Sequence, residues 1–213
     1  MFDARAPHLL PAAYGPLNTA AIRNAPCQMS LGERLFLYTM VYATRPAHYC
    51  EIGTAQGGSA IIAAAAIADA GVPGAIMSLV DLVFSLDKAA EQMLRPRAVF
   101  FEGRSVEQFP LAAARGAPDF LLIDGDHSHE GTLADLELAA ELVAPGAHIL
   151  VHDAYNPPIA AAIDRARTQP EFIDVGFVCQ HGNHLNAGQP IPDGPWAGQP
   201  SLWGGIYYLR RRS

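Results

Sequence analysis

The sequence predicts an α/β fold in which helices cover a doubly wound, mostly parallel β-sheet. Two observations support this prediction. Short apolar runs typical of buried strands alternate with longer helical runs along most of the 213-residue chain, and strands that alternate with helices pair in parallel through right-handed crossovers. Hydrophobic residues make up 50% of the chain, which is enough for one continuous core. The length therefore fits one large domain better than two.

The first long helix is expected to follow an irregular N-terminal arm or cap, residues 1–29, which mixes Pro, Ala, Asn and Gly. From Ser30 onward, apolar residues recur at helical spacing. Ser30 and Glu33 fit the pattern of a capping box, and Pro46 marks the end of this helix. The main domain is therefore expected to cover residues 30–213.

Strands and helices then alternate along the chain. The strands are expected at residues 47–53, 74–81, 98–103, 119–125, 147–153, 172–180 and 203–211. The helices between them are expected at residues 57–71, 86–94, 105–116, 130–143 and 158–169. No helix separates the last two strands, so we expect these two to form an antiparallel pair at one edge of the sheet.

The connection between the last two strands, residues 181–203, is long and rich in Gly, Pro and Asn. Loops of this length inside a compact domain are usually functional or disordered. One interpretation is a lid or wall over a substrate, and the other is a flexible insertion. Trp196 and Trp203 favour the lid, because two tryptophans are costly to leave fully exposed.

Charge and cysteine content exclude several classes of protein. The net charge is −7, which argues against a nucleic-acid surface, since binding phosphates needs clustered Lys and Arg. The chain has three cysteines without paired spacing, which indicates reduced thiols and a cytoplasmic protein. The N-terminal sequence lacks a secretory pattern. The longest small-apolar run, in residues 59–71, is too short to span a membrane.

Polar residues and glycines lie at the carboxyl ends of five expected strands, where open α/β sheets bind ligands. They are Glu51, Gly53, Thr54, Gly57 and Ser59 at the first strand, Asp81 at the second, Gly103, Arg104 and Ser105 at the third, residues 124–129 at the fourth, and His152 and Asp153 at the fifth. Five such strand ends together predict a binding crevice at the carboxyl end of the sheet.

The glycine-rich turn after the first strand allows a close approach of the backbone to a ligand, and the following helix offers free N–H groups. Its spacing is G-x-x-x-G-G, which differs from the G-x-G-x-x-G of dinucleotide sites. Asp81 could accept hydrogen bonds from both hydroxyls of a ribose, or it could cap the next helix. Its place at the end of the second strand favours the ribose.

These patterns together resemble a known family. The motif E-x-G-x-x-x-G-G-S from Glu51 to Ser59, the acidic residue Asp81 and the run IDGDHSHEGTLADLELAAELVAPGAHILVHDA are similar to class I S-adenosylmethionine-dependent methyltransferases. The similarity is narrower to the small-molecule O-methyltransferase branch, which includes macrolide-sugar methyltransferases and cephalosporin-hydroxylase-like proteins. Catechol O-methyltransferases are more distant. The resemblance covers roughly residues 30–180.

The resemblance implies a Rossmann-like, seven-stranded sheet of order 3-2-1-4-5-7-6 with an antiparallel last strand. It also implies S-adenosylmethionine as cofactor and a divalent cation. The implied cofactor residues are Gly53, Thr54, Gly57 and Ser59 around the methionine portion, Asp81 at the ribose, and Gly103, Arg104 and Ser105 beside the adenine, with Glu51 as a further cofactor-binding residue. The implied metal ligands are Asp124, His152 and Asp153.

The D-G-D-H run at the fourth strand fits the chemistry of hydroxyl methylation. A neutral alcohol must lose its proton as it attacks, and a divalent cation such as Mg²⁺, held by Asp124, can lower the pKa of that oxygen. The imidazole of His127 can take the proton as general base. The branch often has an acidic residue where His152 stands, and an imidazole suits Mg²⁺ less well. Mn²⁺, a later transition ion, or no metal with Asp126 or Asp153 as the partner of His127 therefore stay open.

The main prediction is a methyltransferase that acts on a hydroxyl of a small, natural-product or sugar-like acceptor. The alternatives are a metal-independent N-methyltransferase, a nicotinamide-dependent oxidoreductase, a metal-dependent hydrolase and a relative that binds the cofactor without catalysis. The arm and the first helix could form a homodimer contact, but a monomeric cap is equally consistent with the sequence.

Overall fold

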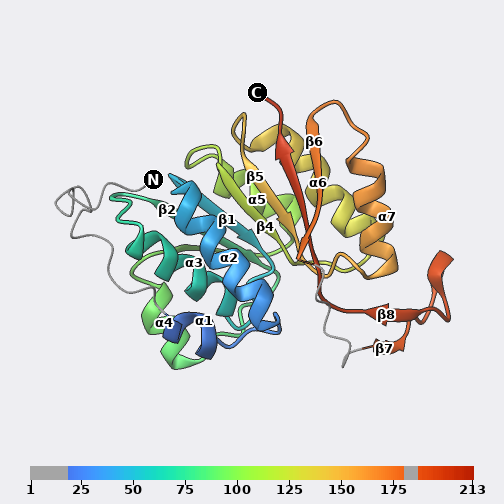
Figure 1. Ribbon diagram of the computed structural model, residues 1–213, viewed down its shortest axis with the longest axis horizontal. Helices are drawn as coiled ribbons and strands as arrows, with labels where there is room; N and C mark the ends of the chain where they lie inside the picture. Colours follow the sequence, from blue (N-terminus) through green and yellow to red (C-terminus); the bar gives the residue numbers. More distant parts are fainter. Residues whose placement is uncertain (1–18, 180–186) are drawn as a thin grey trace, which may run out of the picture.

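The computed structural model describes residues 19–179 and 187–213, so the predicted arm before residue 19 and the predicted connection at 181–186 lie outside the described residues. The described chain forms a seven-stranded sheet between two layers of helices and a separate two-stranded hairpin (Figure 1). The helices are α1 (Thr19–Asn24), α2 (Leu31–Thr44), α3 (Gly58–Asp69), α4 (Lys88–Leu94), α5 (Ser105–Ala113), α6 (His129–Leu142), α7 (Pro157–Ala166) and the 3-10 helix η3 (Gly194–Trp196). The strands are β1 (His48–Ile52), β2 (Ile76–Asp81), β3 (Val99–Glu102), β4 (Phe120–Ile123), β5 (His148–Val151), β6 (Phe172–Cys179), β7 (Ala187–Pro190), β8 (Pro200–Leu202) and β9 (Ile206–Arg211).

The strand order of the main sheet is β3-β2-β1-β4-β5-β9-β6. The neighbouring strands from β3 to β5 pair in parallel, whereas β9 is antiparallel to both β5 and β6. The predicted fold class, strand order and antiparallel edge pair are confirmed. The predicted seventh strand corresponds to β9, because β7 and β8 pair with each other outside this sheet.

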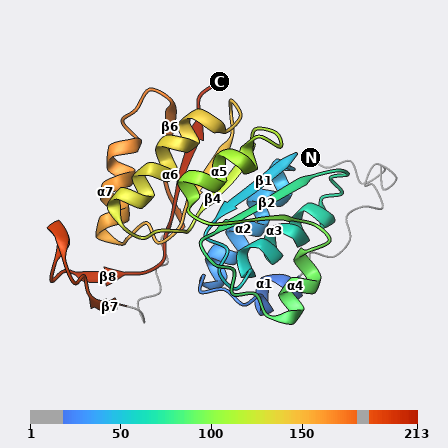
Figure 2. The same cartoon turned by 180° about the vertical axis from the view of Figure 1, so that it is seen from behind.

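Each face of the sheet has its own hydrophobic core, and Figures 1 and 2 show the two helical layers from opposite sides. Successive side chains of a strand point to opposite faces. Tyr49 therefore joins the core beneath α1 to α4, and Cys50 joins the core beneath α5 to α7. β1 is buried along its whole length, and its two polar residues, His48 and Glu51, have side-chain hydrogen-bond partners.

The predicted capping box starts α2. The backbone N–H of Glu33 donates to Ser30 Oγ at 3.3 Å, and the Ser30 N–H donates to Glu33 Oε2 at 2.6 Å. The helix ends before Pro46, where Arg45 has a left-handed backbone with φ of 53°. The sequence pattern therefore located both ends of this helix.

Two regions that we expected to be irregular contain regular structure. In the predicted arm, residues 19–24 form α1, which buries Ala21 and Ile22 against the core. In the predicted loop, residues 187–202 contain the β7–β8 hairpin and η3. The expected arm thus ends in a short helix that packs on the core, and the expected loop contains a short hairpin. Both elements are too short to show the apolar periodicity that identifies an element in sequence.

The alanine-rich run that we judged too short for a membrane span is part of α3, which has 12 residues. No helix in the described part of the chain is both long and apolar enough to cross a bilayer. The run instead buries its alanines in the core that α3 shares with α2.

Candidate active site

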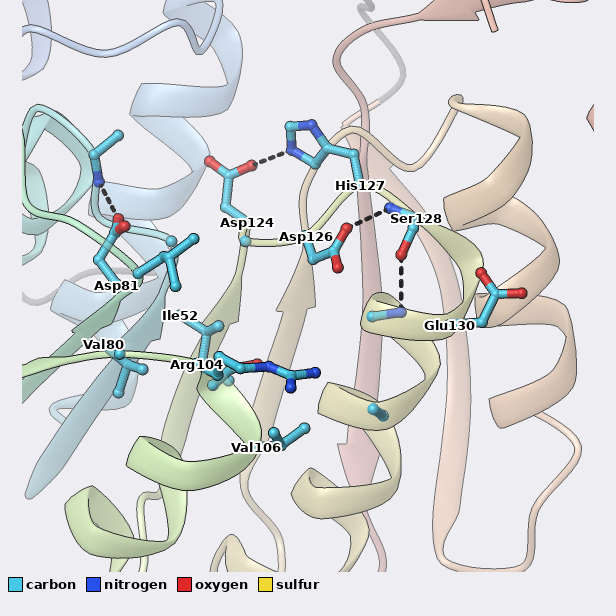
Figure 3. A pocket seen from close by; sticks show the side chains of 18 residues that line it. Ile52, Val80, Asp81, Arg104, Val106, Asp124, Asp126, His127, Ser128 and Glu130 are labelled. Carbon is cyan, nitrogen blue, oxygen red and sulfur yellow. Dashed lines mark hydrogen bonds and ion pairs between the residues drawn. The ribbon is translucent and has the colours of Figure 1, made fainter. Parts of the chain in front are cut away.

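A cavity of about 640 Å³ opens at the carboxyl ends of β1 to β4, where Figure 3 shows its side chains. Small-molecule and cofactor sites commonly occupy about 300–1,000 Å³. The lining residues are Ile52, Gly53, Ala55, Val80, Asp81, Leu82, Gly103, Arg104, Ser105, Val106, Asp124, Gly125, Asp126, His127, Ser128, Glu130, Gly131 and Ala134. Residues that follow four different strands thus meet around one cavity, which we name the main cavity.

The turn between β1 and α3 lies directly against the end of β4. Gly53 has φ of 89°, and a Cβ at this position would lie 2.1 Å from the carbonyl oxygen of Asp124. Only glycine allows this approach without steric conflict. Gly53 therefore allows the β1–α3 turn to lie against Asp124, and both residues line the main cavity.

Asp81 ends β2 and projects into the main cavity (Figure 3). Its Oδ2 accepts the Ala55 N–H at 2.6 Å and its Oδ1 accepts the Val83 N–H at 3.1 Å. A carboxylate has about four acceptor positions, so each oxygen can still accept a hydrogen bond from a ligand. Ala55 has a left-handed φ of 44°, a strained conformation of the kind that clusters at functional sites.

The three residues predicted beside the adenine also line the main cavity. Gly103 follows β3 with φ of 139°, Arg104 is the N-cap residue of α5, and Ser105 begins that helix. These residues and Asp81 come from neighbouring strands, so the parallel sheet places them side by side.

Four other predicted cofactor residues are buried and do not line the main cavity: Glu51, Thr54, Gly57 and Ser59. Glu51 accepts hydrogen bonds from the Ser59 hydroxyl at 2.7 Å and from the Tyr49 hydroxyl at 2.5 Å. Burial raises the pKa of Glu51 to about 7. These contacts hold the β1–α3 turn in place, while a direct contact of these four residues with a cofactor stays a prediction.

Beside the main cavity, Asp124 and His127 from the end of β4 meet His152 and Asp153 from the end of β5. His152 Nδ1 lies 3.0 Å from Asp124 Oδ1 and 3.5 Å from Asp153 Oδ1. His127 Nε2 lies 3.7 Å from Asp124 Oδ1 and 3.5 Å from Asp153 Oδ2. We call these four residues the acid–histidine cluster, and every predicted catalytic and metal-ligating residue belongs to it.

The charges in the acid–histidine cluster depend on one another. Burial alone would lower the pKa of His152, but the carboxylates of Asp124, Glu33 and Asp153 raise it well above its ordinary value. Burial opposes ionisation of Asp124, yet His152 and His127 hold the pKa of Asp124 at about 2. Burial and the charge of Asp124 raise the pKa of Asp153. The carboxylates of the cluster therefore favour the imidazolium form of His152.

His127 is the least enclosed member of the cluster. Burial would lower its pKa, but Asp124 and Asp153 raise it above the ordinary value. Its Nε2 is buried without a hydrogen-bond partner among the described residues, and its ring lies 5.2 Å from that of Trp203. Asp126, the other partner considered for His127, instead accepts the N–H of Ser128 at 2.9 Å (Figure 3).

Sequence analysis missed the contribution of Glu33 to this site. Glu33 is only 1% exposed, and its Oε2 lies 3.7 Å from His152 Nε2, while its Oε1 accepts the Gly205 N–H at 2.6 Å. Burial opposes its ionisation, but His152 keeps the pKa of Glu33 below its ordinary value. A capping-box residue of α2 thus also faces the second ring nitrogen of His152, without a hydrogen bond to it.

A divalent cation fits the residues of the cluster. Asp124, His152 and Asp153 each offer one donor atom, and these atoms lie within 4.8 Å of one another. Ligands on opposite sides of an Mg²⁺-sized ion lie about 4.2 Å apart, so the three donor atoms would need to move only slightly closer together to bind such an ion. Two carboxylates with one imidazole suit Mn²⁺ or a later transition ion better than Mg²⁺, and His152 would have to release its proton to bind.

Asp153 has a backbone that few residues other than glycine adopt. Its φ is 53°, and its Oδ1 accepts the N–H of Gly204, which lies shortly before β9. Such a conformation costs about 1–3 kcal/mol and persists only where surrounding contacts enforce it. The fold therefore holds this carboxylate in the cluster at a cost in stability, which indicates a functional rather than a purely structural position.

Comparisons with known proteins agree with this geometry. Residues 50–154 match a family model described as a methyltransferase domain. The fold is similar to that of cofactor-bound Rv0187 from MTB, with a TM-score of 0.64, 20% identity, and coverage of 92% of this chain and 88% of that chain.

Two further solved structures are similar. One is the O-methyltransferase from Bacillus cereus in complex with SAH, with a TM-score of 0.60, 18% identity, and coverage of 92% of this chain and 88% of that chain. The other is the O-methyltransferase TomG from Streptomyces achromogenes, involved in tomaymycin synthesis and in complex with SAM, with a TM-score of 0.62, 15% identity, and coverage of 87% and 82%. No curated protein matches the chain by sequence.

Proposed function

We propose that this protein transfers the methyl group of S-adenosylmethionine to a hydroxyl of a small molecule with the help of a divalent cation. The match of residues 50–154 to a methyltransferase domain and the fold shared with solved methyltransferases support this proposal. A natural-product or sugar-like acceptor remains the proposed substrate class. The match of residues 50–154 to a methyltransferase domain supports this proposal over the oxidoreductase alternative.

The main cavity supports the cofactor half of this proposal. Asp81 would accept the ribose hydroxyls, and Gly103, Arg104 and Ser105 would border the adenine, because all four line the cavity. The turn at Gly53 would carry the methionine portion toward the acid–histidine cluster. When bound, S-adenosylmethionine supplies an electrophilic methyl group on a positively charged sulfur.

One observation carries the catalytic half. His127 lines both the main cavity and a smaller cavity beside it, and its buried Nε2 makes no hydrogen bond within the described residues but lies 3.5 Å from Asp153 Oδ2 and 3.7 Å from Asp124 Oδ1. A base placed between two cavities can take a proton from an acceptor in one while the methyl donor lies in the other. Asp124 and Asp153 orient the ring and stabilise the imidazolium that forms.

Asp124, His152 and Asp153 would hold the divalent cation. When bound, this ion supplies Lewis-acid stabilisation of a developing oxygen anion. Glu33 positions His152 through its carboxylate, and the backbone of Gly204 positions Asp153. The contacts of Glu33 and Gly204 would keep the donor atoms of His152 and Asp153 in place, as outer hydrogen bonds commonly do in metal sites.

An assay of methyl transfer tests the function. The protein would be incubated with isotopically labelled S-adenosylmethionine, Mn²⁺ and 3,4-dihydroxybenzyl alcohol or benzylamine, and the products identified by mass spectrometry. We expect methylation of the hydroxyl, with kcat lowered about 10²–10⁴-fold in His127→Ala and unchanged in the control His148→Ala, whose ring contacts Tyr208 far from the cluster. Methylation of the amine alone would favour the N-methyltransferase alternative.

A further inference from the structure

A second cavity, of about 300 Å³, lies between the β7–β8 hairpin and the first turns of α6 and α7. Figure 1 shows the hairpin as a separate element that extends beyond α7. The lining residues are His127, Ser128, His129, Glu130, Asn156, Pro158, Ile191, Pro192, Asp193, Gly194, Pro195, Trp196 and Ser201. Because His127, Ser128 and Glu130 line both cavities, the two lie against each other with His127 between them.

We propose, on the basis of the function proposed above, that the second cavity is the acceptor subsite and selects a hydroxylated ring without an anionic group. Asn156 accepts a hydrogen bond from a second hydroxyl or amine of that acceptor. The wall formed by the β7–β8 hairpin supplies the surface on which the ring lies. Three independent features of the cavity lead to this inference.

The first feature is a buried acceptor atom that lacks a partner. Asn156 is only 3% exposed, and its Oδ1 makes no hydrogen bond to any described residue. Asn156 is the N-cap residue of α7, yet its side chain does not cap the helix. Leaving a buried polar group unpaired costs about 1–3 kcal/mol. A ligand that donates a hydrogen bond to Oδ1 would remove this penalty.

The second feature is a set of flat surfaces. The rings of His129 and Trp196 lie 5.5 Å apart with an interplanar angle of 33°, and Pro158, Pro192 and Pro195 add rigid apolar faces to the lining. Aromatic and proline rings present flat faces with little conformational entropy to lose. Such walls fit an aromatic ring or the apolar face of a sugar ring better than a flexible chain.

The third feature is the charge of the lining. Glu130 and Asp193 are acidic and exposed, and the described lining residues include no Lys or Arg, although His127 and His129 lie among them. A carboxylate or phosphate on the acceptor would meet the like charge of these two acidic side chains. Neutral and positively charged acceptors do not meet this repulsion.

A matched set of probes tests the inference. The ligands 3,4-dihydroxybenzyl alcohol, 3,4-dihydroxybenzylamine and 3,4-dihydroxybenzoate share a ring and two hydroxyls but differ in charge. Their affinities would be measured by calorimetry on the full chain in the presence of saturating S-adenosylhomocysteine. We expect the neutral and cationic probes to bind, and the anionic probe to bind at least about tenfold more weakly.

Two variants locate the binding. Asn156→Ala is expected to lower the affinity for the neutral probe about tenfold, which is the effect of losing one hydrogen bond to a buried group. The affinity for S-adenosylhomocysteine should not change. The control Asn24→Ala, in the exposed end of α1, should change neither. The double variant with Glu130→Gln and Asp193→Asn should raise the affinity of the anionic probe, and it keeps the test valid if Asn156→Ala does not fold.

The outcomes separate this inference from the function on which it rests. If S-adenosylhomocysteine binds but none of the three probes does, the acceptor-subsite inference is wrong and the proposed function stands. Equal binding of the anionic and neutral probes, or no effect of either set of substitutions, would also overturn the inference. If S-adenosylhomocysteine itself does not bind, the proposed function fails and the inference fails with it.

Discussion

The carboxylate of Glu33, in the first turn of α2, lies 3.7 Å from Nε2 of His152 at the end of β5. The same carboxylate accepts N–H groups from Ser30 and Gly205. The Glu33 side chain therefore contacts the N-terminus of α2, Gly205 just before β9, and the acid–histidine cluster. This contact makes the geometry of the cluster depend on how α2 packs.

Replacing Glu33 by Gln should affect both stability and the cluster. The charge-assisted hydrogen bonds to Ser30 and Gly205 would weaken, so we expect the free energy of unfolding to fall by about 2 kcal/mol. The pKa of His152 should fall, because the Glu33 carboxylate helps to raise it. Chemical denaturation and an NMR titration of His152 measure the two effects. Glu137→Gln, on the exposed face of α6, is the control, and a variant that matched this control in both measurements would refute the role of Glu33.

Substitution of Gly53 by Ala tests how closely the β1–α3 turn approaches β4. Gly71 is a matched control, since its φ of 62° is also left-handed but a Cβ there would meet no atom within 4 Å. Gly71→Ala should cost about 1–2 kcal/mol from backbone conformation alone. Gly53→Ala should cost clearly more, because its Cβ would also overlap the Asp124 carbonyl. Equal unfolding free energies for the two variants would contradict the close approach.

The contact of Glu33 shows where sequence reasoning ends. Local patterns predicted the capping box and the alternation of strands and helices, and these elements are present. The capping box already accounted for Glu33, so no local signal indicated its second role. The contacts with His152 and Gly205 arise only when distant segments pack together.

Glu51 illustrates a second limit. The motif placed it at the carboxyl end of β1, but residue order does not fix the direction of each side chain. Because side chains alternate across a strand, Glu51 shares the face of Tyr49 and bonds to Ser59 beneath α3. Asp81 and Asp124, which end or follow their strands, line the main cavity instead. The β7–β8 hairpin could not be predicted either, because no periodic pattern in its sequence indicates that its two strands pair.

The pKa of His127 should exceed its ordinary value in protein treated with EDTA, because Asp124 and Asp153 stabilise the imidazolium against the effect of burial. Asp124→Asn removes one of these charges, so the pKa of His127 should fall. A base must be neutral, so the proposed methyl transfer should accelerate as pH rises through the raised pKa. NMR titration of the His127 ring measures the shift, and a pKa that is unaffected by Asp124→Asn would contradict the electrostatic account.

Binding of Mn²⁺ should strengthen as pH rises, because His152 holds a proton that the ion must displace. Calorimetry at two pH values would measure this, and Asp153→Asn should reduce the affinity about 10-fold or more, since it weakens one proposed donor. Asp164→Asn, on exposed α7, is the control. Full methyltransferase activity after exhaustive treatment with EDTA would instead support catalysis by His127 without a metal.

The measurement that tests the central claim most directly is the calorimetric titration of S-adenosylhomocysteine into the wild-type protein and Asp81→Ala. The account predicts binding to the wild type and an affinity at least about tenfold lower in the variant, since hydrogen bonds to a charged group contribute about 1.5–3 kcal/mol. Asp164→Asn should bind as the wild type does. Absence of binding to the folded wild-type protein, or equal affinity in Asp81→Ala, would contradict the assignment of the main cavity to this cofactor.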